Sequence, residues 1–303
     1  MKRAPNFYSK GRLSSYCMND YVILTDSTSD LPDEIVKEFG IEVLPMKFSI
    51  DGKSYVDGEM SADEFYEKIK NKLSASTSQI NPGEFEEYFE KHLKLGQDIV
   101  YVCFSSGLSG TYNSACIAAK ELSRRYPQNR VEVIDSLSAS LGEGLLVYNL
   151  ACMKRLGLSI DDLVKWANDI KLKICHWFIV DDLHHLQRGG RISHVAAIFG
   201  SMVGIKPVLH FKEDGKLYLV EKARGRERAI DVMISKMEKF GVNISDQRIF
   251  ISHATCEKDA LYLAEKIRNK FGVKDITIGT IGPIIGSHTG CGTLALFFLS
   301  DRR

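Results

Sequence analysis

The amino-acid sequence predicts an α/β protein with two α/β domains, the first built on a mostly parallel sheet and the second on a mixed sheet. The 303 residues are 44% hydrophobic, which suffices for sizeable cores in two domains of ordinary size. From Tyr21 onward, short apolar runs alternate with helical patterns, as parallel strands joined by crossover helices do. Beyond Cys175 a hairpin signal, Asp214-Gly215, interrupts that alternation and introduces antiparallel pairing.

The first domain is predicted over residues 21–174, after an extension at 1–20 that lacks the apolar segment of a secretory signal. The polar stretch SASTSQINPG is predicted to be a loop. The predicted strands of this domain lie at 21–24, 41–48, 53–57, 98–104 and 131–135. Its predicted helices lie at 32–39, from a capping box at Ser61 onward, and at 84–94, 113–122, 139–156 and 159–173.

The second domain is predicted over residues 175–303, and RGGRIS is expected to separate two helical stretches within it. Two such domains leave a crevice between them, which is a common place for a ligand. A parallel sheet also binds ligands beyond the carboxyl ends of its strands. The predicted strands lie at 175–180, in a hairpin at 207–222, and at 248–253 and 275–281, and the helices at 226–240 and 257–271.

Charge and cysteine usage narrow the class of partner and the compartment. Forty Lys and Arg against thirty-nine Asp and Glu leave a formal net charge of +1, which argues against nucleic acid as a partner. The seven cysteines are scattered without a C-x-x-C pair, as in the reduced thiols of a cytoplasmic protein. The charge-free segment 276–300 contains glycines and Pro283, so we predict strand, glycine-rich loop and buried strand there, without stable membrane insertion.

The stretch SSGLSGTY, at residues 105–112, joins a predicted strand to a predicted helix. Backbone N–H groups and the positive end of a helix dipole favour an anion at such a junction. Its glycines allow close approach of the backbone, and hydroxyl donors come from Ser105, Ser106, Ser109 and Thr111. An ordinary turn with an N-cap is the alternative. The sequence has no P-loop, no G-x-G-x-x-G fingerprint and no G-x-S-x-G elbow, which weakens nucleotide and hydrolase interpretations.

Two further loops, TDSTSD and STSQ, have the same hydroxyl-rich character and lie near strand ends or helix starts. Three such loops suggest a shared polar pocket, although capping explains each of them alone. Arginine suits carboxylate or phosphate recognition, so the Arg188-Gly189-Gly190-Arg191 loop is a second candidate, with a solvated loop as the alternative.

Histidines supply the remaining candidates. His288, in GSHTG, is either structural or part of the site, since histidine titrates near neutral pH. His176, His184 and His185 lack carboxylate or cysteine partners in a metal-binding pattern, so no metal site is predicted.

Taken in order, these motifs resemble the DegV family of bacterial fatty-acid-binding proteins, the lipid carriers of the fatty-acid kinase system. The resemblance runs from Tyr21 to the C-terminus. Each motif alone is weak, whereas their joint order and spacing are specific. The motifs are TDSTSDLP, DGKSY, TSQ, SSGLSGTYNSA, VID-S, LQRGGRIS, KPVL, EDGK and GSHTG.

The resemblance implies one long-chain fatty acid, such as palmitate, stearate or oleate, in a tunnel between the domains, and no other cofactor. It implies that hydroxyls of the TSQ and SSGLSGT loops bind the carboxylate, with His288 near the same end. The implied carboxylate-binding residues are Thr77 and Ser109, supported by Ser78 and Ser106. The implied residues at the tunnel mouth, facing a kinase, are Arg188, Arg191, Arg224 and Arg226.

The implied function is that of a carrier without catalytic machinery of its own, which presents the carboxylate to a separate fatty-acid kinase for phosphorylation to acyl phosphate. Two departures from the family pattern affect the head-group pocket without removing a proposed contact. Ile80 and Asn81 stand before Pro82, where proline commonly follows TSQ directly, and Cys291 replaces the proline of HTGPG.

Two other functions use the same loops. An esterase or thioesterase would take Ser109 as nucleophile and His288 as its base, but no motif supplies a third residue or an oxyanion hole. A small-anion sensor would bind its ligand without a lipid tunnel.

Overall fold

The computed structural model describes residues 21–192 and 204–302. The predicted extension at 1–20 and the helical stretch expected after RGGRIS lie outside the described residues. The strands are β1 Tyr21–Asp26, β2 Glu42–Leu44, β3 Lys47–Ile50, β4 Lys53–Val56, β5 Ala75–Ser78, β6 Asp98–Cys103, β7 Val131–Asp135, β8 Ile174–Ile179, β9 Ile205–Phe211, β10 Leu217–Arg224, β11 Arg248–His253, β12 Asp275–Thr280 and β13 Leu294–Leu299.

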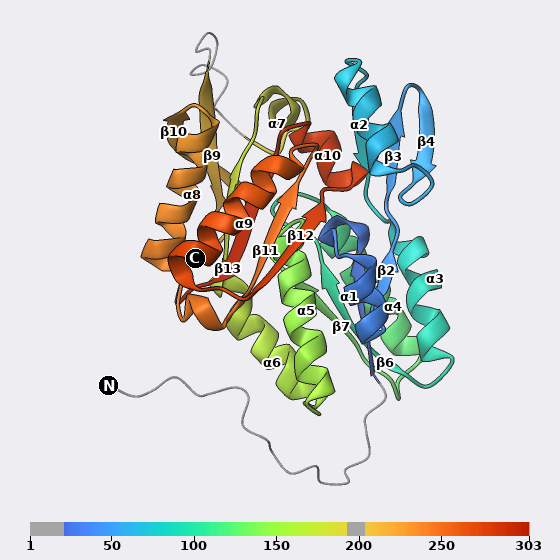
Figure 1. The fold of residues 1–303 in the computed structure, drawn as a ribbon. Helices are drawn as coiled ribbons and strands as arrows, with labels where there is room; N and C mark the ends of the chain where they lie inside the picture. Colours follow the sequence, from blue (N-terminus) through green and yellow to red (C-terminus); the bar gives the residue numbers. More distant parts are fainter. Residues whose placement is uncertain (1–20, 193–203, 303) are drawn as a thin grey trace.

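The helices alternate with these strands over most of the described chain (Figure 1). The α-helices are α1 Asp33–Phe39, α2 Ala62–Lys70, α3 Pro82–Leu93, α4 Thr111–Arg125, α5 Leu141–Arg155, α6 Ile160–Ile170, α7 His184–Arg188, α8 Arg226–Phe240, α9 Glu257–Phe271 and α10 Pro283–Thr289. Short 3₁₀ helices are η1 Ser27–Ser29, η2 Lys171–Lys173 and η3 Ile244–Asp246.

Two large sheets confirm the predicted fold class. A four-stranded sheet has the order β2-β1-β6-β7, and its pairs are all parallel. A six-stranded sheet has the order β10-β9-β8-β13-β11-β12, in which β11 and β12 are parallel and the other pairs antiparallel. A three-stranded antiparallel sheet, β4-β3-β5, accompanies them.

Helix α5 lies between the two large sheets and packs against strands of both, β1 and β6 on one side and β8, β11 and β13 on the other (Figure 1). The first half of this helix is buried all round, as a helix between two layers must be. Strand β8 shows the division of the cores: Phe178 belongs to the central core, whereas Trp177 and Ile179 pack in the core beneath α8 and α9. The central core therefore joins the two sheets.

Two local predictions were wrong. The stretch predicted as a polar loop contains β5, because its backbone pairs with β3 in the register Phe48↔Thr77. The polar sequence ASTS gives no indication of this pairing. The glycine-rich loop predicted within 276–300 contains helix α10, which begins at Pro283 and is almost wholly buried. Proline suits the first turn of a helix, and tertiary packing stabilises this one despite its glycine.

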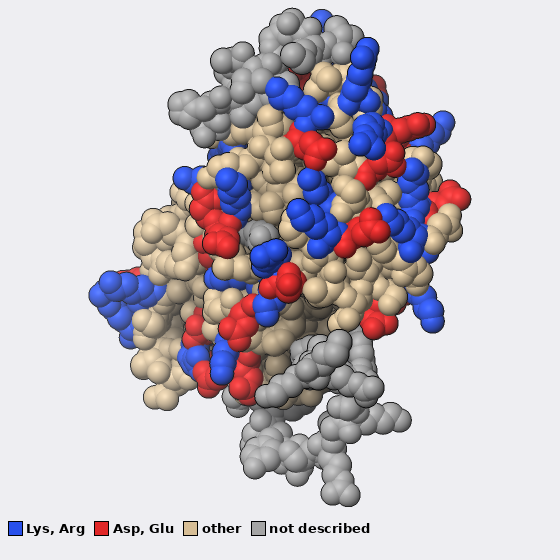
Figure 2. All heavy atoms as spheres, turned by 90° about the vertical axis from the view of Figure 1, so that its left-hand side faces the viewer, with Lys and Arg blue, Asp and Glu red and all other residues tan. Residues whose placement is uncertain are grey.

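The face formed by β10, α8 and α9 carries interleaved charges of both signs (Figure 2). This face therefore presents no field of one sign to a charged partner. Cross-element ion pairs on these elements are Lys236–Glu221, Lys266–Asp231 and Lys270–Glu238.

Candidate functional site

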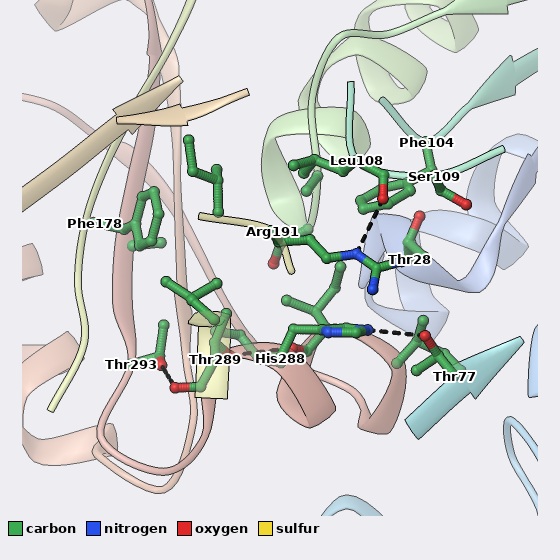
Figure 3. A pocket seen from close by; sticks show the side chains of 18 of the residues that line it. Thr28, Thr77, Phe104, Leu108, Ser109, Phe178, Arg191, His288, Thr289 and Thr293 are labelled. Carbon is green, nitrogen blue, oxygen red and sulfur yellow. Dashed lines mark hydrogen bonds between the residues drawn. The ribbon is translucent and has the colours of Figure 1, made fainter. Parts of the chain in front are cut away.

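A cavity of about 300 Å³ lies where residues from the two large sheets face each other. Its size matches the lower range of small-molecule sites. Figure 3 shows Thr77, His288 and Arg191 together on one side of the cavity, away from Phe178. Most of the wall is apolar, and the apolar lining consists of Met46, Phe104, Leu108, Ala139, Phe178, Leu186, Phe211, Leu217, Ile281, Ile284, Ile285, Ala295 and Phe297.

Strand β5 orients the TSQ motif. Successive side chains of a strand point to opposite faces, so Thr77 lines the cavity and Ser78 is exposed on the other face. Gln79 also lines the cavity, and its Nε2 donates to Ser114 Oγ of α4 at 3.2 Å. The structure therefore places Thr77 in the cavity wall but does not bring Ser78, predicted as a supporting residue, to the cavity.

Ser109, in the SSGLSGTY loop, lines the same cavity. Ser109 Oγ lies 2.9 Å from Thr111 Oγ1 and accepts a hydrogen bond from Thr111 N at 3.2 Å. Ser106 points away: it is exposed, and its N–H donates to Asp135 Oδ1 at 3.1 Å. Ser106 is thus outside the lining, unlike the prediction that grouped it with Ser109.

The first half of the SSGLSGTY loop packs against the turn of the β9–β10 hairpin. Ser105 Oγ donates to Gly215 O at 2.7 Å. A Cβ at Gly107 would lie 2.5 Å from Asp214 O, so the close approach of the two backbones requires glycine there. The EDGK hairpin turn and the SSGLSGTY loop are therefore one packed unit.

His288, on α10, lines the cavity and contacts Thr77 of β5. Its Nε2 lies 2.8 Å from Thr77 Oγ1, and its buried Nδ1 has no hydrogen-bond partner among the described residues. Burial and the neighbouring charges of Arg191 and Arg188 lower the pKa of His288 to about 4. The imidazole is therefore neutral at pH 7. Gly189 makes room for it, since a Cβ at that position would lie 2.3 Å from His288 Nδ1.

Arg191 is the cation of the cavity wall. Its Nε donates to Leu108 O at 3.1 Å, and its Nη1 donates to Gly189 O. These bonds tie the RGGR loop to the SSGLSGTY loop and leave Nη2 without a partner among the described residues. The guanidinium is half-buried, and burial lowers the pKa of Arg191 without discharging an arginine at neutral pH.

The other predicted arginines lie outside the lining. Arg188 is exposed and contacts His185, and Arg224 is exposed at the end of β10. Arg226 is held by Asp259, Asp181 and the carbonyl of Gly292 at 2.8, 3.2 and 2.6 Å. Its side chain is 19% exposed. The structure thus separates Arg191, at the cavity, from Arg188 and Arg224 on the surface and from Arg226 in a structural ion-pair network.

Five hydroxyl residues of the lining were not selected from the sequence, and they are Thr28, Ser140, Ser252, Thr289 and Thr293. Thr28 belongs to TDSTSD, so the prediction that this loop shares a pocket with STSQ and SSGLSGTY is confirmed by Thr28, Thr77 and Ser109. The signal for Ser252 is a serine within the apolar strand RIFISH, which places a hydroxyl on a buried strand face.

The geometry does not assemble the nucleophile and base of a hydrolase. Ser109 bonds to Thr111 and His288 to Thr77, and no hydrogen bond joins Ser109 to His288 in the part of the chain that the structure describes. The described residues also contain no His, Cys, Asp and Glu cluster arranged for a metal ion. Among the described helices, none combines the length and apolar character needed to cross a membrane.

The fold and the site define an α/β protein with parallel and mixed sheets and a mostly apolar cavity that polar side chains also line. The chain belongs to the DegV family: a family model described as "Uncharacterised protein, DegV family" matches residues 20–301. A DegV domain-containing protein of Clostridium perfringens is 47% identical over 289 residues, covering 94% of this chain and 99% of that protein. One from Lactococcus lactis is 36% identical over 286 residues, covering 93% and 98%.

Solved structures of the family share the fold. A DegV family protein of Thermus thermophilus, described by its fatty-acid binding, has a TM-score of 0.83 at 28% identity and covers 93% of this chain and 99% of its own. DegV of Bacillus subtilis, described as a fatty-acid-binding protein, has a TM-score of 0.81 at 29% identity, with coverage of 93% and 99%. The Streptococcus pneumoniae Fatty Acid Kinase B3 protein, loaded with linoleic acid, has a TM-score of 0.82 at 25% identity, with coverage of 93% and 100%.

Proposed function

We propose that this protein binds one long-chain fatty acid, such as palmitate, stearate or oleate, in the cavity between its sheets. The observation that carries the proposal is one cavity with a mostly apolar wall, on which Thr77, Ser109, His288 and Arg191 supply hydrogen-bond donors and a positive charge. Such a cavity suits a ligand with an apolar body and one anionic end. The fatty acids bound by its structural relatives have that chemistry.

The apolar wall accounts for affinity. Burial of a sixteen-carbon chain at ~0.8 kcal/mol per methylene gives roughly 11 kcal/mol before the costs of association are subtracted. The polar cluster then sets the direction in which the acid lies.

The head group would be held by hydroxyl hydrogens. If neutral His288 donates from Nε2 to Thr77 Oγ1, the hydroxyl hydrogen of Thr77 stays available for a carboxylate oxygen. The free Nη2 of Arg191 supplies a charge-assisted donor from the opposite loop.

We further propose that the bound acid is phosphorylated by a separate fatty-acid kinase. In that reaction a carboxylate oxygen attacks the γ-phosphorus of ATP, and acyl phosphate and ADP are formed. The exposed Arg188 and Arg224 are the residues we assign to contact with the kinase, since exposed charges mainly set partner recognition and association rate.

Native mass spectrometry of the gently purified full chain tests the first proposal. We expect a retained mass equal to one C16 or C18 acid, which denaturation releases and gas chromatography identifies. A chain that carries no acid, and whose delipidated form does not take up stearate, would rule the proposal out.

A coupled assay tests the second proposal. Stearate-loaded protein is mixed with purified bacterial fatty-acid kinase and ATP, and acyl phosphate is trapped as the hydroxamate. We expect Arg188→Gln and Arg224→Gln to lower the rate of hydroxamate formation without changing stearate affinity. Equal rates for both variants and the wild type would contradict the assignment of these arginines, and no hydroxamate from any of them would contradict the carrier role.

A further inference from the structure

Helix α10, which carries His288 to the cavity, has a sequence that gives it little stability of its own. It has seven residues, PIIGSHT, with a glycine in the middle. Isolated helices shorter than about 12 residues are marginal in water, and glycine lowers helix stability further. The position of α10, and with it that of His288, is therefore set by the elements packed against it, among them α2 and β5.

Tyr66, on α2, is buried against α10 and contacts it at two points. Its side chain is 1% exposed. The Tyr66 hydroxyl donates to Ile281 O at 2.9 Å, just before α10 begins at Pro283. A Cβ at Gly286 would lie 2.5 Å from Tyr66 Oη, so the same oxygen lies against the backbone in the middle of the helix. One buried oxygen atom thus contacts both the start and the middle of this segment.

Helix α2 also contacts the strands that carry Thr77 (Figure 1). The ring of Phe65 lies edge-on to that of Phe48 in β3, with the ring centroids 5.5 Å apart. Phe48 pairs with Thr77 of β5. Adjacent residues of α2 therefore contact the two sides of the bond between Thr77 and His288, Phe65 on the strand side and Tyr66 on the helix side.

We propose that Tyr66 is a positioning residue for His288. Its hydroxyl oxygen fixes how closely α10 packs on α2, and this spacing holds His288 Nε2 at 2.8 Å from Thr77 Oγ1. Tyr66 is not among the described residues that line the cavity, so it acts through His288. The inference rests on the proposed fatty-acid binding, in which that bond leaves the hydroxyl hydrogen of Thr77 to the carboxylate.

Tyr66→Phe tests the proposal, because it removes the oxygen and keeps the ring. The ¹⁵N resonance of His288 Nε2 is measured in delipidated full-length protein at pH 7, assigned with His288→Gln. Thr77→Ala, which removes the bonding partner directly, gives the value of the unbonded nitrogen. We expect Tyr66→Phe to move the resonance toward that value. Stearate affinity should fall about 3- to 10-fold, the effect of one hydrogen bond.

A second variant approaches the same oxygen from the helix. Gly286→Ala places a methyl group 2.5 Å from Tyr66 Oη, so it should displace α10 and weaken stearate binding. In the double variant with Tyr66→Phe the oxygen is gone, and stearate should bind more tightly than to Gly286→Ala alone. The recovery should be partial, since Tyr66 Cζ and Phe65 Cε1 still lie 3.0 Å from the added carbon. Two changes that merely destabilised the fold would weaken binding further when combined.

Tyr21→Phe is the matched control. Tyr21 is also a buried tyrosine whose hydroxyl donates to a backbone carbonyl at 2.9 Å, in this case that of Leu158. Tyr21 lies on β1 and does not contact α10 among the described residues. We expect this variant to keep the His288 resonance and the stearate affinity of the wild type.

An unchanged His288 resonance in Tyr66→Phe, or a double variant that binds stearate no better than Gly286→Ala, overturns the assignment. A wild-type protein that fails to bind stearate refutes the proposed function instead, and the resonance, which is measured without ligand, still decides whether Tyr66 positions His288. Thermal unfolding identifies any variant that loses its fold. If Tyr66→Phe does, the His288 resonance is measured in Gly286→Ala, which should also move it toward the unbonded value.

Discussion

At the scale of single residues, the ability of the cavity to bind an anionic ligand depends on which hydroxyl hydrogens have no acceptor within the protein. Thr77 and Ser109 each have one hydroxyl hydrogen and one neighbouring group, His288 and Thr111 respectively. When that neighbour acts as the donor, the hydroxyl hydrogen is available to a ligand. Removing either hydroxyl should therefore affect binding more than folding.

Thr77→Ala and Ser109→Ala are each expected to weaken stearate binding by about 1–3 kcal/mol, because a charged carboxylate loses a donor. Isothermal titration calorimetry on delipidated protein measures the effect. Ser76→Ala is the control, since Ser76 neighbours Thr77 in β5 but is exposed on the opposite face. Affinities of both cavity variants equal to that of the control would refute the head-group assignment.

His288 makes a second prediction at this scale, on stability against pH. Its folded pKa of about 4 lies below the ordinary value of 6.5, so between these values the unfolded chain binds a proton that the folded chain does not. The free energy of unfolding should therefore fall as pH drops from 6.5 to 4, by up to about 3 kcal/mol from this residue. His288→Gln, compared with the wild type by urea unfolding across that range, should reduce the slope. Parallel slopes would show that His288 takes up protons freely in the fold.

At the scale of elements, a loop after a parallel strand can pack against another element with some residues and line the cavity with others. In SSGLSGTY, Ser105 and Gly107 pack against the β9–β10 hairpin, and Ser109 faces the cavity. Hydroxyl and glycine content alone does not distinguish these uses, because both require donors and close approach. Only the neighbour across the fold assigns each position.

Gly107→Ala is expected to destabilise the protein by about 1–3 kcal/mol, because the added Cβ meets backbone atoms of the hairpin turn that cannot rotate away. Urea unfolding measures the change. Gly83→Ala is the matched control: it lies in the first turn of α3, and its Cβ would meet only the Asn81 side chain, at 3.3 Å. A loss at Gly107 no larger than at Gly83 would mean that the hairpin is not packed on the loop.

At the scale of the whole molecule, the two sheets meet across a buried acidic region. Burial raises the pKa of each of its carboxyls, which are Asp26, Asp30, Asp57 and Glu143. Asp30 Oδ1 also accepts a hydrogen bond from the N–H of Gly282, which joins the segment after β1 to the segment after β12. The junction between the sheets is therefore most stable when these groups are protonated.

This gives a prediction for alkaline pH. Asp30 has a folded pKa of about 8, above its ordinary 3.8, so the stability that its proton provides is present at low pH and lost as pH rises through 8. Asp30→Asn should keep the bonds to Ser140 and Gly282, and asparagine tolerates the φ of 51° at this position. The variant should gain about 1 kcal/mol per pH unit over the wild type between pH 5.5 and 7.5 by urea unfolding. A constant difference across that range would refute the raised pKa.

Local sequence patterns were sufficient to predict the fold class, most of the helices and strands, and the hydroxyl-rich loops that contribute to one cavity. These features follow from local patterns: apolar alternation, caps, and glycine turns at the ends of strands. Thr77, Ser109, His288 and Arg191, which were selected because their motifs resemble those of the family, line that cavity.

Which of the hydroxyls face the cavity depends on contacts between segments that are distant in the sequence. Strand β5 had no local signal, because its pairing with β3 creates it, and that pairing turns Thr77 inward and Ser78 outward. Ser140 and Ser252 belong to segments far apart in the chain and meet only because α5 lies between the sheets. Local sequence encodes the helices and strands, whereas the hydrogen-bond partner of a side chain depends on which distant segment the fold places beside it.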